Sequence, residues 1–331
     1  MNLKRNLVKK MDKVFIDKLE INLEEINTTR IKIDTGFRCN EKCTYCYYRN
    51  NLDDDSIKED LILKQLDKVK EFGFTEVEFS GGESSYHPDF INFIKYATKL
   101  GLRSTTLSNG TMSTELLKKA KEAGLEEIMY SFHGNEKSHE KVTKLEGSYE
   151  MIIKQLIECK KLGILTRVNY IVHKNSIDNI SEVLLELQTL EEVDEIYIHQ
   201  YNFLPINEWG DAEKIARVQQ KLLQENYNTL EYNLEYLLSK DKEFNIRYIE
   251  YCNINEKYHR YIKNHYHHYF DRWDWHPFFM HKEDILNRKD FELNELEIKE
   301  HLIHQRASQY YKTDECLTCP HFKYCDGYKN D

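Results

Sequence analysis

Short apolar segments and longer amphipathic segments alternate through the first two thirds of the chain. Six short segments rich in β-branched and aromatic residues predict strands, at Arg30–Thr35, Glu76–Ser80, Ser104–Ser108, Glu127–Ser131, Thr166–Val172 and Glu195–Tyr201. Longer segments with apolar residues every three or four positions predict helices, at Ile57–Phe72, Asp89–Leu100, Thr114–Ala123, Tyr149–Leu162 and Ile177–Leu187. Glycine follows four of these helices, where a left-handed capping conformation suits it.

Strands that alternate with helices in this order predict a parallel sheet with its helices outside, and ligand chemistry at the carboxyl ends of the strands. The pattern alone does not distinguish an open sheet from a partial barrel. Ser56 and Glu59 have the spacing of a capping box, which predicts the start of the first of these helices.

Composition narrows the class of protein. The 331 residues carry a net charge of −10 with both signs interspersed, which predicts no nucleic-acid partner. No apolar run has the length of a membrane span and no signal peptide is evident, so we expect a cytoplasmic protein without a membrane partner. Leu3, Leu7 and Met11 predict an amphipathic helix in an N-terminal extension, residues 1–28. Packing of this helix on the domain is favoured over a role at a membrane surface.

Cys39, Cys43 and Cys46 form the most informative motif, C-x3-C-x2-C, with the aromatic Tyr45 before the last cysteine. Eight cysteines without a secretory signal favour metal clusters over disulfides. The spacing differs from that of bacterial ferredoxins, which supply four cysteines per cluster. A structural zinc site needs a fourth ligand, and none lies near Cys46. Three thiolates would leave one iron of a four-iron cluster open to a small-molecule ligand. We favour this interpretation over a redox pair or half of a zinc site.

This cysteine loop resembles the signature of the radical S-adenosylmethionine (radical SAM) enzymes. The resemblance implies a partial (β/α)6 barrel and a [4Fe-4S] cluster that binds S-adenosylmethionine. It also implies reductive cleavage of the cosubstrate to a 5′-deoxyadenosyl radical. Gly81, Gly82 and Glu83 follow the second predicted strand. By position in the family they would contact the amino group of the cosubstrate, at a site to which Tyr45 would also belong.

Two further strand tips complete the cosubstrate site that the resemblance implies. Ser108 and Asn109 end the third predicted strand, and Ser131 ends the fourth. The family uses these tips for the ribose and carboxylate of the cosubstrate, although small polar residues also satisfy their own turns. His133 stays open between a ligand contact and a solvated loop histidine.

The fifth predicted strand places Arg167 and Asn169 on one face. We expect Asn169 to face the lumen and the cosubstrate. Arg167 is left open, because a guanidinium in the lumen would be costly without a carboxylate partner. In the sixth predicted strand His199 and Tyr201 share the face opposite Gln200, and either set can face substrate.

A second cysteine group, Cys316, Cys319 and Cys325, lies near the end of the chain. The segment resembles the auxiliary-cluster region of radical SAM enzymes known as a SPASM domain or, when shortened, a Twitch domain. The cysteines outside the first trio suffice for one auxiliary [4Fe-4S] cluster, with Cys252 at the end of a predicted strand, IRYIEYC, as fourth ligand. Zinc is the main alternative, and a site with three ligands is a lesser one. Cys159 reads as a core residue.

We therefore expect a barrel over residues 29–205, a helical bridge over 206–244 and a Twitch-like domain over 245–331. The run at 258–281 is rich in histidine and aromatic residues. We favour a packing interface there over a substrate-facing wall or an extra metal site.

The predicted activity is hydrogen abstraction in the modification of a ribosomally made peptide, with oxidation or epimerisation of a sugar or aminocyclitol as the alternative. The segment before the first strand is too short for a leader-peptide-binding domain, so a separate recognition protein or an edge-strand contact would present a peptide. A flavodoxin or ferredoxin would supply electrons. The alternative from another class is a cluster-bearing sensor or electron carrier. The strand-tip motifs argue against it, because a carrier needs no cosubstrate cleft.

Overall fold

A single parallel sheet organises the protein. The computed structural model describes residues 29–46, 57–172, 194–200, 244–247, 249–262, 310–312, 314–325 and 327–329, with helical positions at 231, 234, 235 and 238. The sheet has seven strands that pair in the order of the chain, all in parallel. They are β1 (Arg30–Asp34), β2 (Glu76–Ser80), β3 (Arg103–Ser108), β4 (Leu125–Phe132), β5 (Leu165–Val172), β6 (Glu195–Gln200) and β7 (Phe244–Arg247).

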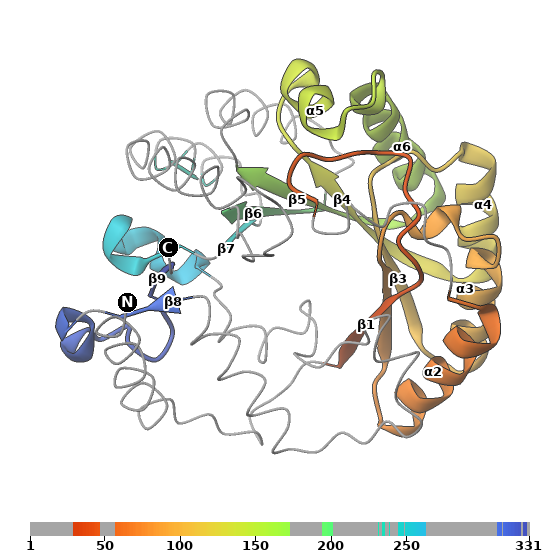
Figure 1. The fold of residues 1–331 in the computed structure, drawn as a ribbon, viewed down its shortest axis with the longest axis horizontal. Helices are drawn as coiled ribbons and strands as arrows, with labels where there is room; N and C mark the ends of the chain where they lie inside the picture. The colour runs from red at the N-terminus through yellow and green to blue at the C-terminus, as the bar shows by residue number, and fades with distance from the viewer. Residues whose placement is uncertain are drawn as a thin grey trace, which may run out of the picture.

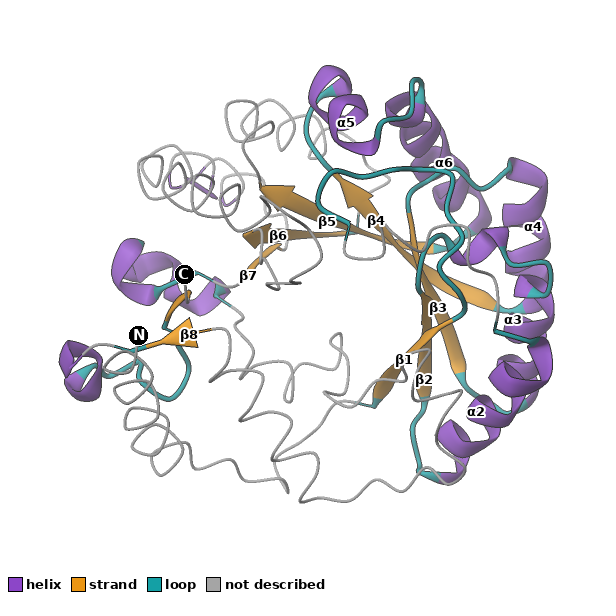
Figure 2. Cartoon of the chain, viewed as in Figure 1, coloured by secondary structure: helices purple, strands orange, loops and turns teal. Residues whose placement is uncertain are grey.

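The strands form an arc with the described helices along its outer face, as Figures 1 and 2 show. The described strands β1 and β7 pair only with β2 and β6, so the arc is a partial barrel. The helices are α2 (Glu59–Glu71), α3 (Phe90–Lys99), α4 (Thr114–Ala123), α5 (Glu136–Thr143) and α6 (Ser148–Leu162), with a 3-10 turn η3 (Ser84–Tyr86) after β2. Among the described residues no helix combines the length and apolar character needed to cross a bilayer.

Alternation along each strand separates an apolar outer face from a polar lumen. In β1, Ile31 and Ile33 belong to the core that packs beneath the helices. Arg30, Lys32 and Asp34 are buried on the other face. The register then aligns the lumen-facing residues of successive strands. The sequence therefore folds with a hydrocarbon layer outside the sheet and ionisable groups inside it.

Most predicted elements are confirmed, with small shifts of their ends. Gly124 and Gly163 end α4 and α6 in the left-handed conformation, as expected. The capping-box prediction was wrong in its placement. Glu59 is the first residue of α2, and Lys58 is the N-cap without a side-chain hydrogen bond. Acidic residues in this first turn still suit the positive end of the helix dipole. The predicted helix Ile177–Leu187 and the extension 1–28 lie outside the described residues.

The end of the sheet differs from the expectation for IRYIEYC. β7 ends at Arg247, and Tyr251–Asn253 forms the 3-10 turn η5, which is followed by η6 (Glu256–Tyr261). Cys252 is therefore an exposed turn residue and does not end a strand. Near the chain end, β8 (Tyr310–Tyr311) and β9 (Tyr328–Lys329) form a small antiparallel pair around η8 (Asp314–Thr318). Of the run 258–281, only the first residues are described.

Candidate functional site

The loop with Cys39, Cys43 and Cys46 leaves the carboxyl end of β1 and is tied to the tip of β2. The backbone N–H of Gly82 donates to the carbonyl of Gly36 at 2.9 Å, and that of Glu83 donates to the carbonyl of Arg38 at 2.9 Å. A Cβ atom on Gly82 would lie 2.3 Å from the carbonyl oxygens of both Phe37 and Arg38. The resemblance to the radical SAM family implied that these glycines contact the cosubstrate. In the structure the absence of a Cβ leaves room for the backbone at the start of the cysteine loop.

Helix α5 holds the same loop from the other side, and the sequence analysis missed this helix. The N–H groups of Lys42 and Thr44 donate to the carbonyls of Thr143 and Val142 at 2.9 and 3.0 Å. These are carbonyls of the last turn of α5, which has no intrahelical partners for them. The loop amides thus satisfy the helix end. Asn135 was the sequence signal that could have indicated the start of this helix. Its side chain caps α5 by accepting a hydrogen bond from the Ser138 N–H at 3.1 Å.

Glu83 is the buried acid at the centre of the strand tips, with a 2% exposed side chain. Its carboxylate accepts from the Ser85 hydroxyl at 2.7 Å, from the Asn109 backbone N–H at 2.7 Å and from the Ser108 hydroxyl at 3.2 Å. Burial raises its pKa above the ordinary value despite these bonds. Among the described residues no lysine or arginine forms an ion pair with it. The site therefore offers a buried carboxylate without a cation.

Asn109 joins this carboxylate to the cysteine loop. While its backbone N–H binds Glu83, its side-chain amide donates to Asn40 Oδ1 at 2.9 Å and to Cys39 Sγ at 3.7 Å. Thr111 also donates to Asn40 Oδ1, at 3.1 Å. Three of the predicted site residues, Glu83, Ser108 and Asn109, are thus brought into direct contact.

The three thiols of the loop lie close enough to influence one another electrostatically. Burial, with neighbouring negative groups adding to it, raises the pKa of the Cys39 thiol to about 12 and that of Cys43 well above its usual range. The Cys43 thiol donates to Glu41, a residue that the sequence analysis did not single out. Burial raises the Glu41 pKa to about 8. No three acidic, histidine or cysteine side chains of the described residues converge as ligands of a single metal ion would.

Tyr45 lies beside these thiols and contacts the tip of β4. Its hydroxyl is 2.9 Å from His133 Nε2, and the two rings pack edge to face at 4.9 Å. His133 is 1% exposed, so it is not a solvated loop histidine. Ser131 and Asn169 are aligned across β4 and β5 and are half-buried on the lumen face, as expected for Asn169. The side chains of His199 and Gln200, and all of Tyr201, lie outside the described part.

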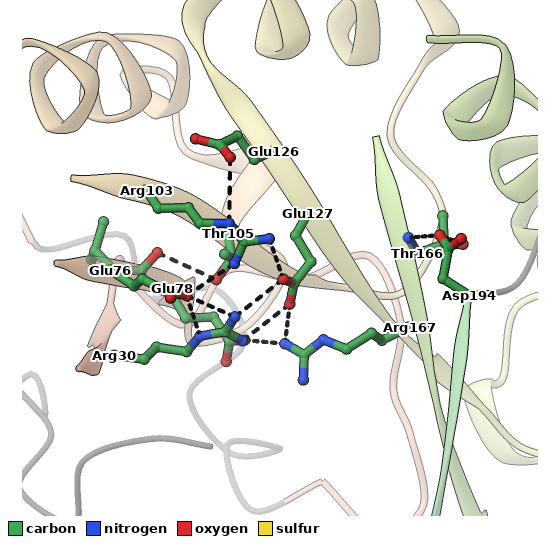
Figure 3. A network of polar contacts seen from close by, with 11 residues as sticks. Arg30, Glu76, Glu78, Arg103, Thr105, Glu126, Glu127, Thr166, Arg167 and Asp194 are labelled. Atoms are coloured by element: carbon green, nitrogen blue, oxygen red, sulfur yellow. Dashed lines mark hydrogen bonds and ion pairs between the residues drawn. The ribbon is translucent and has the colours of Figure 1, made fainter. Parts of the chain in front are cut away.

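Arg167 also faces the lumen, and carboxylates surround it, which resolves the alternative left open by the sequence. It forms ion pairs with Glu78 at 3.4 Å and with Glu127. Arg30 and Arg103 bind the same Glu127, at 3.1 and 2.6 Å. Figure 3 shows these side chains meeting across β1 to β5, with Glu76 beside them. We refer to Arg30, Glu76, Glu78, Arg103, Glu127 and Arg167 as the ionic floor.

The second cysteine group, Cys316, Cys319 and Cys325, lies in and just after η8. The ring of His321, inside this group, stacks on Tyr251 at 4.4 Å and 12°. The segment that carries Cys252 therefore packs against the loop that carries the other three cysteines. Cys159, by contrast, is fully buried, and its sulfur lies 3.1 Å from the Tyr130 hydroxyl. This confirms Cys159 as a core residue.

Comparisons with known proteins agree with this geometry. Residues 33–187, from β1 through all four strand-tip motifs, match the family described as the Radical SAM superfamily. These residues form a radical SAM domain. The Fe-coproporphyrin III synthase of Methanosarcina barkeri is 28% identical over 163 residues, 47% of this chain and 40% of that protein. A probable GTP 3′,8-cyclase of Saccharolobus islandicus is 25% identical over 217 residues, 62% of this chain and 68% of that protein.

Similarity of fold to a solved structure extends over most of the chain. The crystal structure of Streptococcus suis SuiB bound to S-adenosylmethionine superposes with a TM-score of 0.59 at 17% identity, over 92% of this chain and 75% of that one. At this identity the likeness shows the fold. It confirms the parallel sheet predicted from the strand–helix pattern and the partial barrel implied by the resemblance to the radical SAM family.

Radical SAM membership brings a [4Fe-4S] cluster with S-adenosylmethionine as its ligand, and the residues of the loop fit it. Three thiols are present, and the Asn109 amide donates to one of the sulfurs, an interaction that tunes iron–sulfur clusters. When bound, the cluster delivers one electron to the sulfonium of the cosubstrate.

Proposed function

We propose that this radical SAM protein generates a 5′-deoxyadenosyl radical from S-adenosylmethionine and uses it to abstract a hydrogen atom from a substrate in the barrel lumen. Asn109 is the observation that carries the proposal. It binds Glu83 through its backbone and the Cys39 sulfur through its side chain. One small molecule with a cationic group at Glu83 would therefore also reach the open iron of a cluster on the loop.

The residues at the strand tips have distinct parts in this proposal. Cys39, Cys43 and Cys46 hold the cluster. Glu83 would accept the ammonium group of the cosubstrate, because a cation relieves the cost of a buried carboxylate. Ser131 and Asn169 face the lumen within the same site and would bind the rest of the cosubstrate. The hydrogen bonds and close packing between the Gly81–Gly82 segment and the cysteine loop hold the strand-tip residues in position relative to the cysteines.

A peptide is the substrate class that we favour. Fold similarity extends to a structure described as SuiB bound to its precursor peptide SuiA, with a TM-score of 0.58 over 96% of this chain. Four polar residues, Lys32, Asp34, Ser80 and Arg247, are buried on the lumen face of the described strands. These side chains can donate or accept hydrogen bonds with the backbone amides and polar side chains of a peptide. A separate leader-binding protein and a flavodoxin or ferredoxin are proposed partners.

A small molecule is the second candidate. The S. islandicus relative, which matches 62% of this chain, is named for a reaction on GTP. A polar lumen also suits such a substrate. Sugars and aminocyclitols therefore belong in the same screen as peptides.

We also propose an auxiliary [4Fe-4S] cluster on Cys316, Cys319 and Cys325 with Cys252 as fourth ligand, in a Twitch-like domain over residues 245–331. Two contacts support it. The Tyr251–His321 stack brings the Cys252 segment to the loop. The Lys312 ammonium donates to the carbonyls of Phe322 and Cys325, the latter at 2.7 Å, and so shapes the backbone around the cysteines.

Anaerobic reconstitution tests the activity. Reconstituted protein with dithionite and S-adenosylmethionine should release methionine and 5′-deoxyadenosine, measured by chromatography and mass spectrometry. A triple Cys39→Ala, Cys43→Ala, Cys46→Ala variant should release neither. Cys159→Ala is the matched control: it removes a core thiol and should keep both the iron and the activity. An intact cluster in the wild type without any 5′-deoxyadenosine would refute the proposal.

Metal analysis of the same triple variant tests the auxiliary site. About four irons should remain per chain, since a cubane holds four. These irons should disappear when Cys316→Ala and Cys319→Ala are added. Zinc in place of iron would refute the auxiliary cluster and leave the first cluster unaffected.

A further inference from the structure

His133 connects the cysteine loop to the interior of the barrel wall. The residue follows β4 directly, and its Nε2 lies 2.9 Å from the Tyr45 hydroxyl. The rings meet edge to face, with centroids 4.9 Å apart and planes inclined by 61°. His133 is 1% exposed. The tyrosine beside the last cysteine therefore contacts the imidazole both through its hydroxyl and through its ring.

The imidazole of His133 is itself fixed in orientation. His139 of α5, fully buried, stacks on it with centroids 5.3 Å apart and planes inclined by 23°. Phe132 and Tyr149 pack against His139 at 5.4 and 6.0 Å. Buried aromatic rings packed on several sides occupy one rotamer. His133 thus presents Nε2 to Tyr45 from a rigid support.

The same helix also fixes the backbone just before Tyr45. Thr44 and Lys42 donate to the last-turn carbonyls of α5, and Tyr45 follows Thr44 directly. Helix α5 therefore holds Tyr45 in two ways. Its last turn binds the backbone just before the residue, and His139 supports the tyrosine side chain through His133. A half-buried ring held in this way offers a flat surface of defined direction beside the cluster loop.

We propose that His133 is a positioning residue, which orients the Tyr45 ring to bind the nucleoside part of S-adenosylmethionine. The inference rests on the proposed function, because it needs the cosubstrate at this loop. A ring in the correct rotamer packs on a planar base without losing side-chain freedom at the moment of binding. Loss of the hydrogen bond leaves the ring in place but lets it turn.

Substitutions of the two partners test the inference through the Kd for S-adenosylmethionine, measured by equilibrium dialysis on reconstituted protein. Tyr45→Phe and His133→Phe should each weaken binding about fivefold, as expected for one lost hydrogen bond. The double variant should be no weaker than either single one, because the interaction is shared. His133→Gln, whose amide can reach the same position, should recover most of the affinity.

Tyr130→Phe is the matched control. It also removes a buried tyrosine hydroxyl on β4, one that donates to Gln155 at 2.9 Å on the helix side of the sheet. It should lower thermal stability and leave the Kd unchanged. Iron content should stay at the wild-type level in the Tyr45 and His133 variants.

Three results would overturn the inference: an unchanged Kd in His133→Phe, additive losses in the double variant, or a loss of iron in His133→Phe that accounts for its weaker binding. Failure of the proposed function is distinguishable. In that case the wild type would bind the cosubstrate without forming 5′-deoxyadenosine, while the comparison of Kd values among variants would still test the role of His133.

Discussion

Two buried glutamates on the same sheet, Glu127 in the ionic floor and Glu83 at the strand tips, have opposite surroundings. Glu127 is 1% exposed and lies among the guanidinium groups of Arg30, Arg103 and Arg167. Glu83 is 2% exposed and is held by hydroxyl and amide donors alone among the described residues. The fold neutralises the Glu127 carboxylate, whereas the Glu83 carboxylate has no cationic partner among the described residues and, in the proposed function, binds the ammonium group of the cosubstrate.

The pKa values follow this difference. Burial alone would raise the pKa of Glu127, but the three arginines lower it to about 2. Burial raises the pKa of Glu83, and its hydrogen bonds only moderate the effect. Among the described residues, arginines thus pair with the carboxylate in the ionic floor, and none pairs with the carboxylate at the strand tips. A buried acid without a cation is costly for folding and is therefore a marker of ligand binding.

Glu127→Gln should have the largest effect that this comparison predicts. The substitution leaves two buried guanidinium groups, of Arg30 and Arg167, and the partly buried one of Arg103 with too little negative charge. Removing one member of a buried ion pair costs roughly 3–5 kcal/mol. Urea unfolding of the variant should show a loss of that size. Glu126→Gln is the matched control on the same strand. Glu126 is 55% exposed and lies 3.4 Å from Arg103, so its loss should cost less than about 1 kcal/mol.

Acid titration should separate these variants further. The folded pKa of Glu127, about 2, lies below its ordinary value of 4.5, so its contribution is present above that ordinary value and is lost as the pH falls toward 2. Wild type should lose stability relative to Glu127→Gln across this window. Equal acid sensitivity of the two proteins would show that the arginines do not hold the carboxylate in its ionised form.

The sequence was sufficient for the strands of the barrel because each carries an uninterrupted apolar face against the helices. It was also sufficient to bring Glu83, Ser108 and Asn109 together, since parallel strands end at one edge. The ionic floor could not be predicted from the sequence. Arg30, Glu78 and Arg167 are far apart in the chain, and strand patterning alone does not show that their long side chains meet in one lumen.

Local signals were the weakest guide near the cysteines. Helix α5 is eight residues long and mostly polar, so apolar periodicity did not reveal it, although it holds the cysteine loop. Cys252 follows an apolar run that reads as a strand, yet the chain leaves the sheet at Arg247 and turns before the cysteine. The packing role of Gly82 after β2 was also not predictable, because only the fold shows that Phe37 and Arg38 occupy the space a Cβ would need.

Glu83→Gln should reverse the pattern of Glu127→Gln. Removing a charge that burial disfavours should leave the free energy of unfolding within about 1 kcal/mol of wild type, since most hydrogen bonds survive. The Kd for S-adenosylmethionine should rise about 10- to 100-fold, because a charge-assisted bond to the ammonium group is lost. Calorimetry and equilibrium dialysis on one preparation measure both quantities. A variant that unfolds as readily as Glu127→Gln would place Glu83 among the stabilising acids instead.

Ser108→Ala makes the smallest change and tests the cause of the raised Glu83 pKa. The Ser108 hydroxyl donates to the two carboxylate oxygens at 3.3 and 3.2 Å, and this bond lowers the pKa because it favours the ionised form. Without it the pKa rises further. Only the ionised carboxylate pairs with the ammonium group, so affinity increases as the pH rises through this pKa. The variant should shift that increase to higher pH and weaken binding about two- to fivefold below it. Wild-type and variant profiles that coincide would mean that the Ser108 hydroxyl does not contribute to the pKa of this acid.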